Sequence, residues 1–187
     1  MSQRACSKLA ASLFASACLL IAAGPSLAQD NIFDEARFGS VLGVDQANPE
    51  RGVLITGMLF FDPWDHDNAT GWSKFTRPRI HIGGDVSTAG ETNQIYAGFS
   101  WTAHLNDTFF LEAGFGGSVN DGNLHPDGSN SPALGCHTLF HEYLAAGINL
   151  DKNWRLVGTA EHSSHAGLCG SDNSGLTRAG LMVGYKF

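Results

Sequence analysis

The C-terminal segment Leu176–Phe187 (LTRAGLMVGYKF) constrains the fold of this chain more than any other stretch. Alternate residues fall into two sets. One set carries the charges, on Arg178 and Lys186, and the other is mostly apolar and ends in aromatic residues: Thr177, Ala179, Leu181, Val183, Tyr185 and Phe187. Because successive side chains of a strand point to opposite faces, the segment predicts a β-strand with one apolar face and one charged face.

Seven earlier segments show a weaker alternation and are separated by stretches rich in turn-forming residues. The predicted strands span 35–45, 50–62, 75–86, 94–105, 108–120, 136–150, 154–166 and 176–187. Eight strands are enough to close a barrel and remove the sheet edges. The sequence therefore predicts an all-β fold, an eight-stranded antiparallel barrel.

The direction of the alternation predicts that this barrel spans a membrane. In the seventh strand, Trp154 and Leu156 share a face, while Arg155 and Glu161 lie on the other. A soluble lipocalin-like barrel, the alternative, would bury those charges in an apolar interior, which is unfavourable. Apolar-out, polar-in alternation is typical of transmembrane barrels. A terminal aromatic residue with Tyr185 two places before it also resembles the sorting signal of bacterial outer-membrane barrels.

Residues 1–28 have the pattern of a cleaved secretory signal. A basic start is followed by an apolar run, Leu9–Ala23, and a small-residue cleavage site at Ser26–Ala28. The run is shorter than the roughly 20 residues of a membrane-spanning helix. The barrel domain is therefore expected over 29–187. The formal net charge of the whole chain is −7, and removal of Arg4 and Lys8 with the signal makes the remaining chain more acidic, which argues against nucleic acid as a partner.

Two cysteines, Cys136 and Cys169, remain after removal of the signal. An even number in an exported protein favours a disulfide over two free thiols. Cys136 opens the sixth predicted strand and Cys169 follows the seventh, so both are expected at the outer end of neighbouring strands.

The expected topology has short periplasmic connections and longer outer ones. LNDT and LDKN, after the fourth and sixth strands, are short as required. The connection after the second strand, DPWDHDNATGWSK, is too long for a periplasmic turn. Its acidic part, 62–68, lacks the glycine and distal glutamate of a calcium loop and is expected to be a solvated turn.

A chemically unusual cluster lies in EHSSHAGLCG, residues 161–170. His162 and Ser164 share a strand face, which the alternation predicts to face lipid. If the turn before this strand is centred on Lys152, Glu142 lies directly opposite His162. A serine, a histidine and a carboxylate on one patch form the arrangement of nucleophilic acyl transfer. The alternative is a metal site of His141, His162 and His165, but the last two differ in strand parity.

The segment HSSHAGL (162–168) resembles the His-any-Ser-Asn-Ala-Gly-Leu signature of the lipid A 3-O-deacylases, the PagL family. NSGL (173–176) is similar to the family's Asn-Asp-Gly-Ile/Leu motif. IYAGFSW (95–101), FFLEAGFGGSVNDG (109–122) and LGCHTLFHEYLAAG (134–147) add to the resemblance, which is strongest from about 76 to 187.

The resemblance implies a bacterial outer-membrane serine esterase that removes the 3-O-linked acyl chain from lipid A of lipopolysaccharide, without metal or other cofactor. His162 would be the general base and Ser164 the nucleophile. The family's usual acid position is Thr177 here, and Glu142 is the expected replacement.

The family asparagine after the serine is His165, so the expected oxyanion donors are Gly167 and His165. These departures keep a second reading open, that of a non-catalytic small barrel acting as a surface antigen, adhesin or structural protein.

Overall fold

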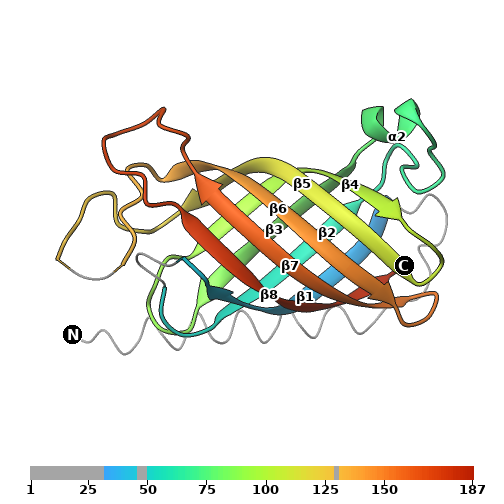
Figure 1. Ribbon diagram of the computed structural model, residues 1–187, viewed down its shortest axis with the longest axis horizontal. Coiled ribbons are helices and arrows are strands. Elements are labelled where there is room, and N and C mark those ends of the chain that lie inside the picture. The colour runs from blue at the N-terminus through green and yellow to red at the C-terminus, as the bar shows by residue number, and fades with distance from the viewer. Residues whose placement is uncertain (1–31, 46–49, 129–130) are drawn as a thin grey trace. The chain divides into compact units, whose positions relative to one another are not determined.

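The structure is a computed structural model that describes residues 32–45, 50–128 and 131–187. The predicted signal, residues 1–28, lies outside the described residues. The elements are β1 (Phe33–Gly43), β2 (Leu54–Phe61), α2 (Trp72–Thr76), β3 (Arg79–Ser87), β4 (Gln94–His104), β5 (Phe109–Asn120), β6 (Thr138–Asn149), β7 (Trp154–Ser164) and β8 (Leu176–Lys186). Each strand pairs antiparallel with the next, and β8 pairs with β1, which closes the barrel (Figure 1). The predicted all-β, eight-stranded fold is confirmed.

The barrel wall carries its apolar side chains on the outside. In β8, Leu181 is 62% exposed and Val183 is 47% exposed, whereas Arg178 on the same strand is fully buried. The predicted alternation is thus confirmed, and an exposed apolar surface that runs around a whole barrel fits lipid better than water. Among the described residues, no helix is long and apolar enough to cross a membrane.

Charged side chains in the barrel interior are paired with one another. Toward the end where β1 begins and β8 ends, Arg37 donates to Glu35 and Glu112 at 2.6 and 2.7 Å, and Arg155 contacts Glu35 at 2.8 Å. Toward the opposite end, Arg178 bonds Glu50 at 2.6 Å. Paired charges with satisfied hydrogen bonds are the form in which such groups are tolerated in an interior. The predicted inward position of Arg155 and Arg178 is confirmed, and side chains occupy the lumen.

The two ends of the barrel differ in their connections. Both ends of the described barrel chain lie at one end, the proximal end, where Phe187 N donates to Asp34 O at 3.0 Å. The turns 105–108 and 150–153 are at this end and are short, as predicted. The connections 88–93 and 165–175, and the described parts 121–128 and 131–137 of the β5–β6 connection, lie at the distal end (Figure 1). At this end a disulfide joins Cys136 to Cys169. The predicted disulfide and its location are confirmed.

The β2–β3 connection, residues 62–78, is long although it lies at the proximal end. The third strand was predicted to begin at residue 75, but it begins at Arg79. Residues 72–76 instead form a short helix that ends before Pro78. The expectation of a solvated turn over 62–68 is also wrong for His66, which is fully buried. Its Nδ1 donates to Arg77 O at 2.7 Å, and its Nε2 accepts from Thr102 N at 2.9 Å. The connection is therefore folded onto the barrel.

Candidate active site

Strand β7 places His162 and Ser164 on the outer face near the distal end. Both side chains are half-buried, while their neighbours Glu161 and Ser163 are buried inside the barrel. Ser163 contacts His141 Nδ1 at 3.0 Å within the lumen. The strand thus separates two adjacent serines, of which one faces the interior and the other faces the surroundings of the barrel. The predicted orientation of this cluster is observed.

The strands on either side of β7 flank His162 with two oxygen-bearing side chains. The β6–β7 register pairs Glu142 with His162, as predicted from the turn, and it also pairs Phe140 with Ser164. The β7–β8 register pairs His162 with Thr177. Glu142 is half-buried on the same outer face. The predicted opposition of Glu142 and His162 is therefore present in the fold.

Thr177, and not Glu142, holds the imidazole in the structure. The distance from His162 Nδ1 to Thr177 Oγ1 is 2.9 Å. Within the described part of the chain, no hydrogen bond joins His162 to Glu142 or to Ser164. When Nδ1–H donates to the hydroxyl, Nε2 keeps its lone pair, which is the form that a general base requires. Catalytic hydrogen bonds are often long without substrate and tighten when it binds.

Gly175 packs against the other edge of the imidazole. Its φ is +69°, and a Cβ built on it would lie 2.9 Å from His162 Cε1 and 3.4 Å from Nε2. Only glycine adopts this backbone conformation easily, and any larger residue meets the ring. The position of the imidazole therefore depends on the segment before β8, a dependence that the sequence motif NSGL did not reveal by itself.

A tight turn follows Ser164. Leu168 N donates to His165 O at 2.9 Å, and the two central residues, Ala166 and Gly167, have φ values of +51° and +76°. These are the angles of a type I′ turn. A positive φ is strained for alanine, and such strain is concentrated at functional sites. Among described residues, no hydrogen-bond acceptor contacts the Gly167 N–H, which leaves this donor available to a ligand.

His165 stabilises this turn through both of its ring nitrogens. Nε2 donates to Asp172 O at 2.7 Å, and Nδ1 accepts from Cys169 N at 3.2 Å. With both nitrogens engaged, the ring has no N–H to offer an oxyanion. The structure thus gives His165 a positioning role that differs from the predicted oxyanion contact. The disulfide holds the same segment to the start of β6.

The alternative metal site of His141, His162 and His165 is not formed. His141 is fully buried inside the barrel, whereas His162 lies on the outer face. Among the described residues, no three histidine, cysteine or acidic side chains are grouped to hold a metal ion.

An apolar groove runs along the outer face next to Ser164. Phe115 and Phe140 stack with ring centroids 6.0 Å apart and form one wall, and Leu168, which is 78% exposed, rises from the turn. Gly117 leaves the floor open, since a Cβ built on it meets only Leu139 O at 3.6 Å. The groove is lined by Phe115, Gly116, Gly117, Thr138, Leu139, Phe140, His165, Leu168 and Cys169. Strand β6 pairs Phe140 with Ser164, so the groove adjoins the strand position of the serine.

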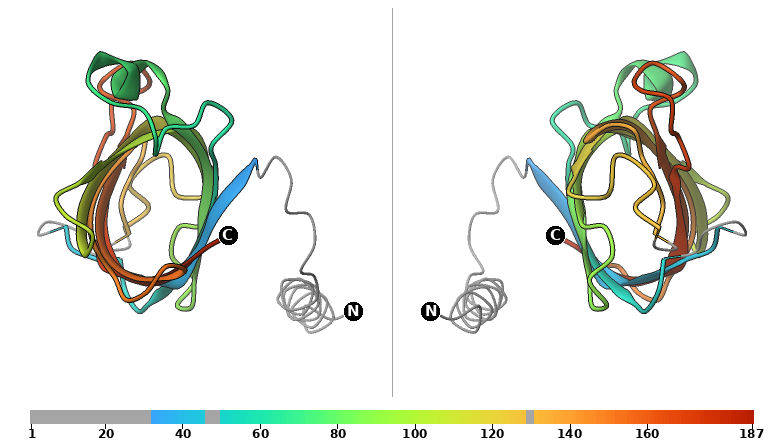
Figure 2. Two further views of the ribbon diagram at one scale, coloured as in Figure 1. Left: turned by 90° about the vertical axis from the view of Figure 1, so that its right-hand side faces the viewer. Right: turned by 90° about the vertical axis from the view of Figure 1, so that its left-hand side faces the viewer.

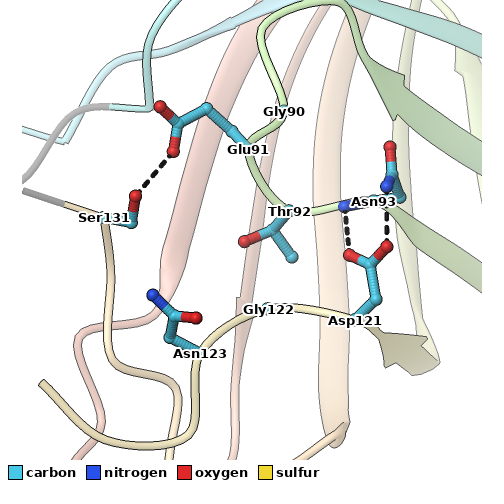
Figure 3. A pocket seen from close by; sticks show the side chains of 8 residues that line it. All are labelled: Gly90, Glu91, Thr92, Asn93, Asp121, Gly122, Asn123 and Ser131. Carbon is cyan, nitrogen blue, oxygen red and sulfur yellow. Dashed lines mark hydrogen bonds between the residues drawn. The ribbon is translucent and has the colours of Figure 1, made fainter. Parts of the chain in front are cut away.

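A second, polar pocket lies among the distal connections and is lined by residues 90–93, 121–123 and 131 (Figure 3). Its carboxylates are already bonded. Asp121 accepts from the backbone and side-chain N–H groups of Asn93, each at 2.7 Å, and Glu91 accepts from Ser131 at 2.9 Å. These contacts join two connections, and the pocket holds no nucleophile–base pair.

Comparisons with known proteins agree with this barrel fold. The profile of the family "Lipid A 3-O-deacylase (PagL)" matches residues 59–186. The crystal structure of the outer membrane enzyme PagL aligns with a TM-score of 0.58 at 21% identity, over 79% of this chain and 97% of that one.

The N-terminal β-barrel domain of Pseudomonas aeruginosa OprF aligns with a TM-score of 0.56 at 12% identity, over 85% of this chain and 100% of that one. At these identities the structural matches show the fold alone. No curated protein matches the sequence.

Proposed function

The chain belongs to the lipid A 3-O-deacylase (PagL) family and is an outer-membrane β-barrel, and from this premise we propose that it is a serine esterase acting on lipid A. The reaction removes the 3-O-linked acyl chain of lipopolysaccharide. The observation that carries the proposal is the pair His162 and Ser164 on the lipid-facing side of β7, with the Gly167 N–H in the following turn.

In the proposed mechanism, Ser164 Oγ attacks the carbonyl carbon of the ester while His162 Nε2 takes its proton. The negative charge that develops on the carbonyl oxygen is stabilised by the Gly167 N–H. The tetrahedral intermediate then collapses, the C–O bond to the sugar breaks, and His162 returns the proton to the departing sugar hydroxyl. Water, activated by the same imidazole, hydrolyses the acyl-serine and releases the fatty acid.

Two groups are proposed to support the base. The Thr177 hydroxyl, 2.9 Å from Nδ1, fixes the ring orientation. Glu142 lies across from His162 on the same face, and its negative charge stabilises the imidazolium that forms during the reaction. The neutral hydroxyl thus supplies orientation and the carboxylate supplies charge, two tasks that a single acid performs in a Ser-His-Asp triad.

The location of the site suits a membrane lipid. We place the distal end of the barrel in the outer leaflet, because the short turns and both ends of the described barrel chain lie at the other end, which is the periplasmic end in barrels of this kind. A substrate that diffuses laterally reaches the outer face of β7 directly. The apolar groove beside the stacked Phe115 and Phe140 is suited to an acyl chain, and burying the methylenes of that chain contributes about 0.8 kcal/mol each.

The test is mass spectrometry of lipid A extracted from a bacterial outer membrane in which the protein is expressed. The expected result is the loss of one hydroxyacyl chain, abolished by Ser164→Ala and by His162→Asn. Ser163→Ala is the matched control, because that serine is the adjacent residue but faces the lumen, and it should retain activity. Lipid A left unchanged by folded wild-type protein, also in detergent-treated membranes, would favour a non-catalytic barrel.

A further inference from the structure

The β2–β3 connection exposes large aromatic side chains although it is firmly folded. Trp64 is 43% exposed, Trp72 is 77% exposed and Phe75 is 59% exposed. Helix α2, all of whose residues are described, buries none of its side chains. Figure 2 shows this helix outside the ring of strands. The aromatic residues thus neither fill the barrel nor cover its mouth.

These side chains pack instead on the outer face of β4. Phe75 stacks on Trp101 with ring centroids 5.8 Å apart and an interplanar angle of 17°, and Trp101 Nε1–H donates to Phe75 O at 2.8 Å. Trp64 lies 6.4 Å from Phe99 between centroids. We call Trp64, Trp72, Phe75, Phe99 and Trp101 the aromatic patch. Because Phe99 and Trp101 belong to the lipid-facing wall, the patch is continuous with that wall.

The connection is held in this position by polar contacts on its inner side. His66 is fully buried and bonds the backbone of Thr102 and of Arg77. Asp67 pairs with Lys186 of β8, and Asp62 Oδ1 accepts from His66 N at 2.7 Å. Contiguous exposed apolar side chains on a fixed segment are typical of interaction sites.

We propose that the aromatic patch is an anchor in the headgroup–acyl boundary of the periplasmic leaflet, where it contacts phospholipid. Trp and Phe at this depth expose an apolar body to the acyl chains, and the indole N–H has a polar partner. Trp154 and Tyr185, 5.0 Å apart between ring centroids, lie at the same end of the barrel on β7 and β8. They and the patch form parts of one aromatic girdle. The patch extends this girdle beyond the barrel wall on the β4 side, and the inference does not depend on the esterase chemistry.

The experiment measures the environment of a nitroxide spin label on α2. Cys136 and Cys169 are joined in a disulfide, so a cysteine introduced by Thr76→Cys can be labelled selectively once residues 1–28 are removed. The matched control is Asp107→Cys, in the exposed turn between β4 and β5 at the same end. Both proteins are folded into phosphatidylcholine vesicles, and collision of the label with oxygen, which enters lipid, is compared with collision with a water-soluble nickel chelate.

The expected result is that oxygen relaxes the label at residue 76 more than the nickel chelate does, and that this order is reversed at residue 107. Adding Trp72→Ala and Phe75→Ala to the Thr76→Cys protein should shift residue 76 toward the values at residue 107. The proposal is overturned if residue 76 has the same nickel accessibility as residue 107, which would place α2 in water. Low access to both reagents would indicate a covering protein, such as a second copy, and would equally overturn it. If the accessibility of the label at residue 76 is unchanged after the two alanine substitutions, the aromatic side chains do not hold α2 at the interface, and the proposal is overturned.

Discussion

Gly175→Ala is expected to reduce activity through His162 while leaving the barrel folded. The substitution has two separable effects. The backbone at residue 175 has a φ of +69°, and a non-glycine residue in this region is destabilised by roughly 1–2 kcal/mol. The new methyl group would also lie 2.9 Å from His162 Cε1, which is closer than the usual carbon–carbon contact of about 3.5–4.0 Å. Its distance to Ser163 O would be 3.3 Å.

The second effect determines the loss of activity. Backbone on one side limits the movement of the methyl group, so the imidazole must shift by several tenths of an ångström and its bond to Thr177 is distorted. A misplacement of about 1 Å in a catalytic group lowers the rate about 100-fold. We therefore expect kcat to fall between about 10- and 100-fold, with a loss of stability that is small beside the roughly 5–15 kcal/mol of a typical domain.

Gly90→Ala separates the two effects. Gly90 has a φ of +77°, and a Cβ built on it meets nothing within 4 Å, so the variant carries the backbone effect without the contact. Both variants should lose similar stability in denaturant titrations, and only Gly175→Ala should lose lipid A deacylation measured by release of the hydroxyacyl chain. Wild-type turnover in a folded Gly175→Ala protein would refute the assignment of His162 as the base.

Further perturbations test the remaining contacts of the site and of the β2–β3 connection. Thr177→Val removes the hydroxyl at 2.9 Å from His162 Nδ1 and should lower kcat about fivefold, the value of one hydrogen bond of roughly 1 kcal/mol; an unchanged kcat would exclude Thr177 as the positioning group. Glu142→Gln should lower kcat by about tenfold or more through the lost charge, and a wild-type rate would remove Glu142 from the mechanism. Replacing both Cys136 and Cys169 with serine opens a loop with a sequence separation of 33 and should lower the free energy of unfolding by about 3–4 kcal/mol on the chain-entropy model, as measured in urea; no change would mean that the disulfide does not restrain the unfolded chain. For Asp67, burial raises the pKa but Lys186 outweighs it and lowers the pKa to about 2 from 3.8. The depressed pKa means that Asp67 stabilises the attached connection above about pH 4 and loses this effect as the pH falls toward 2. Proteolysis of residues 62–78 should therefore increase at low pH in the wild-type protein. The Asp67→Asn variant should show no such increase.

The sequence predicted those features that depend on periodicity. The two-residue repeat in LTRAGLMVGYKF set the outward face of β8, and the same parity put His162 and Ser164 outside and Glu161 inside. A short turn at Lys152 fixed the β6–β7 register and so the opposition of Glu142 and His162. Register and facing follow from local spacing, because a strand allows only two faces.

Other features depend on contacts between distant segments, which no local pattern encodes. The Thr177 bond to His162 requires the β7–β8 register, and the engagement of both His165 nitrogens requires the path of residues 169–172. The acidic, polar composition of 62–68 suggested solvent, but His66 is buried because backbone groups of Thr102 and Arg77 satisfy its ring. Composition describes the average exposure of a segment and not the one side chain that turns inward.

The central claim, that Ser164 is an activated nucleophile on the lipid-facing surface, is tested most directly by labelling with a serine-directed phosphonate ester carrying an alkyl chain. The protein is labelled in detergent micelles and digested, and the modified residue is located by tandem mass spectrometry. The account predicts a covalent adduct on Ser164 that disappears in His162→Asn and persists in Ser163→Ala. An adduct on Ser163, or folded protein in which Ser164 remains unmodified, would contradict it.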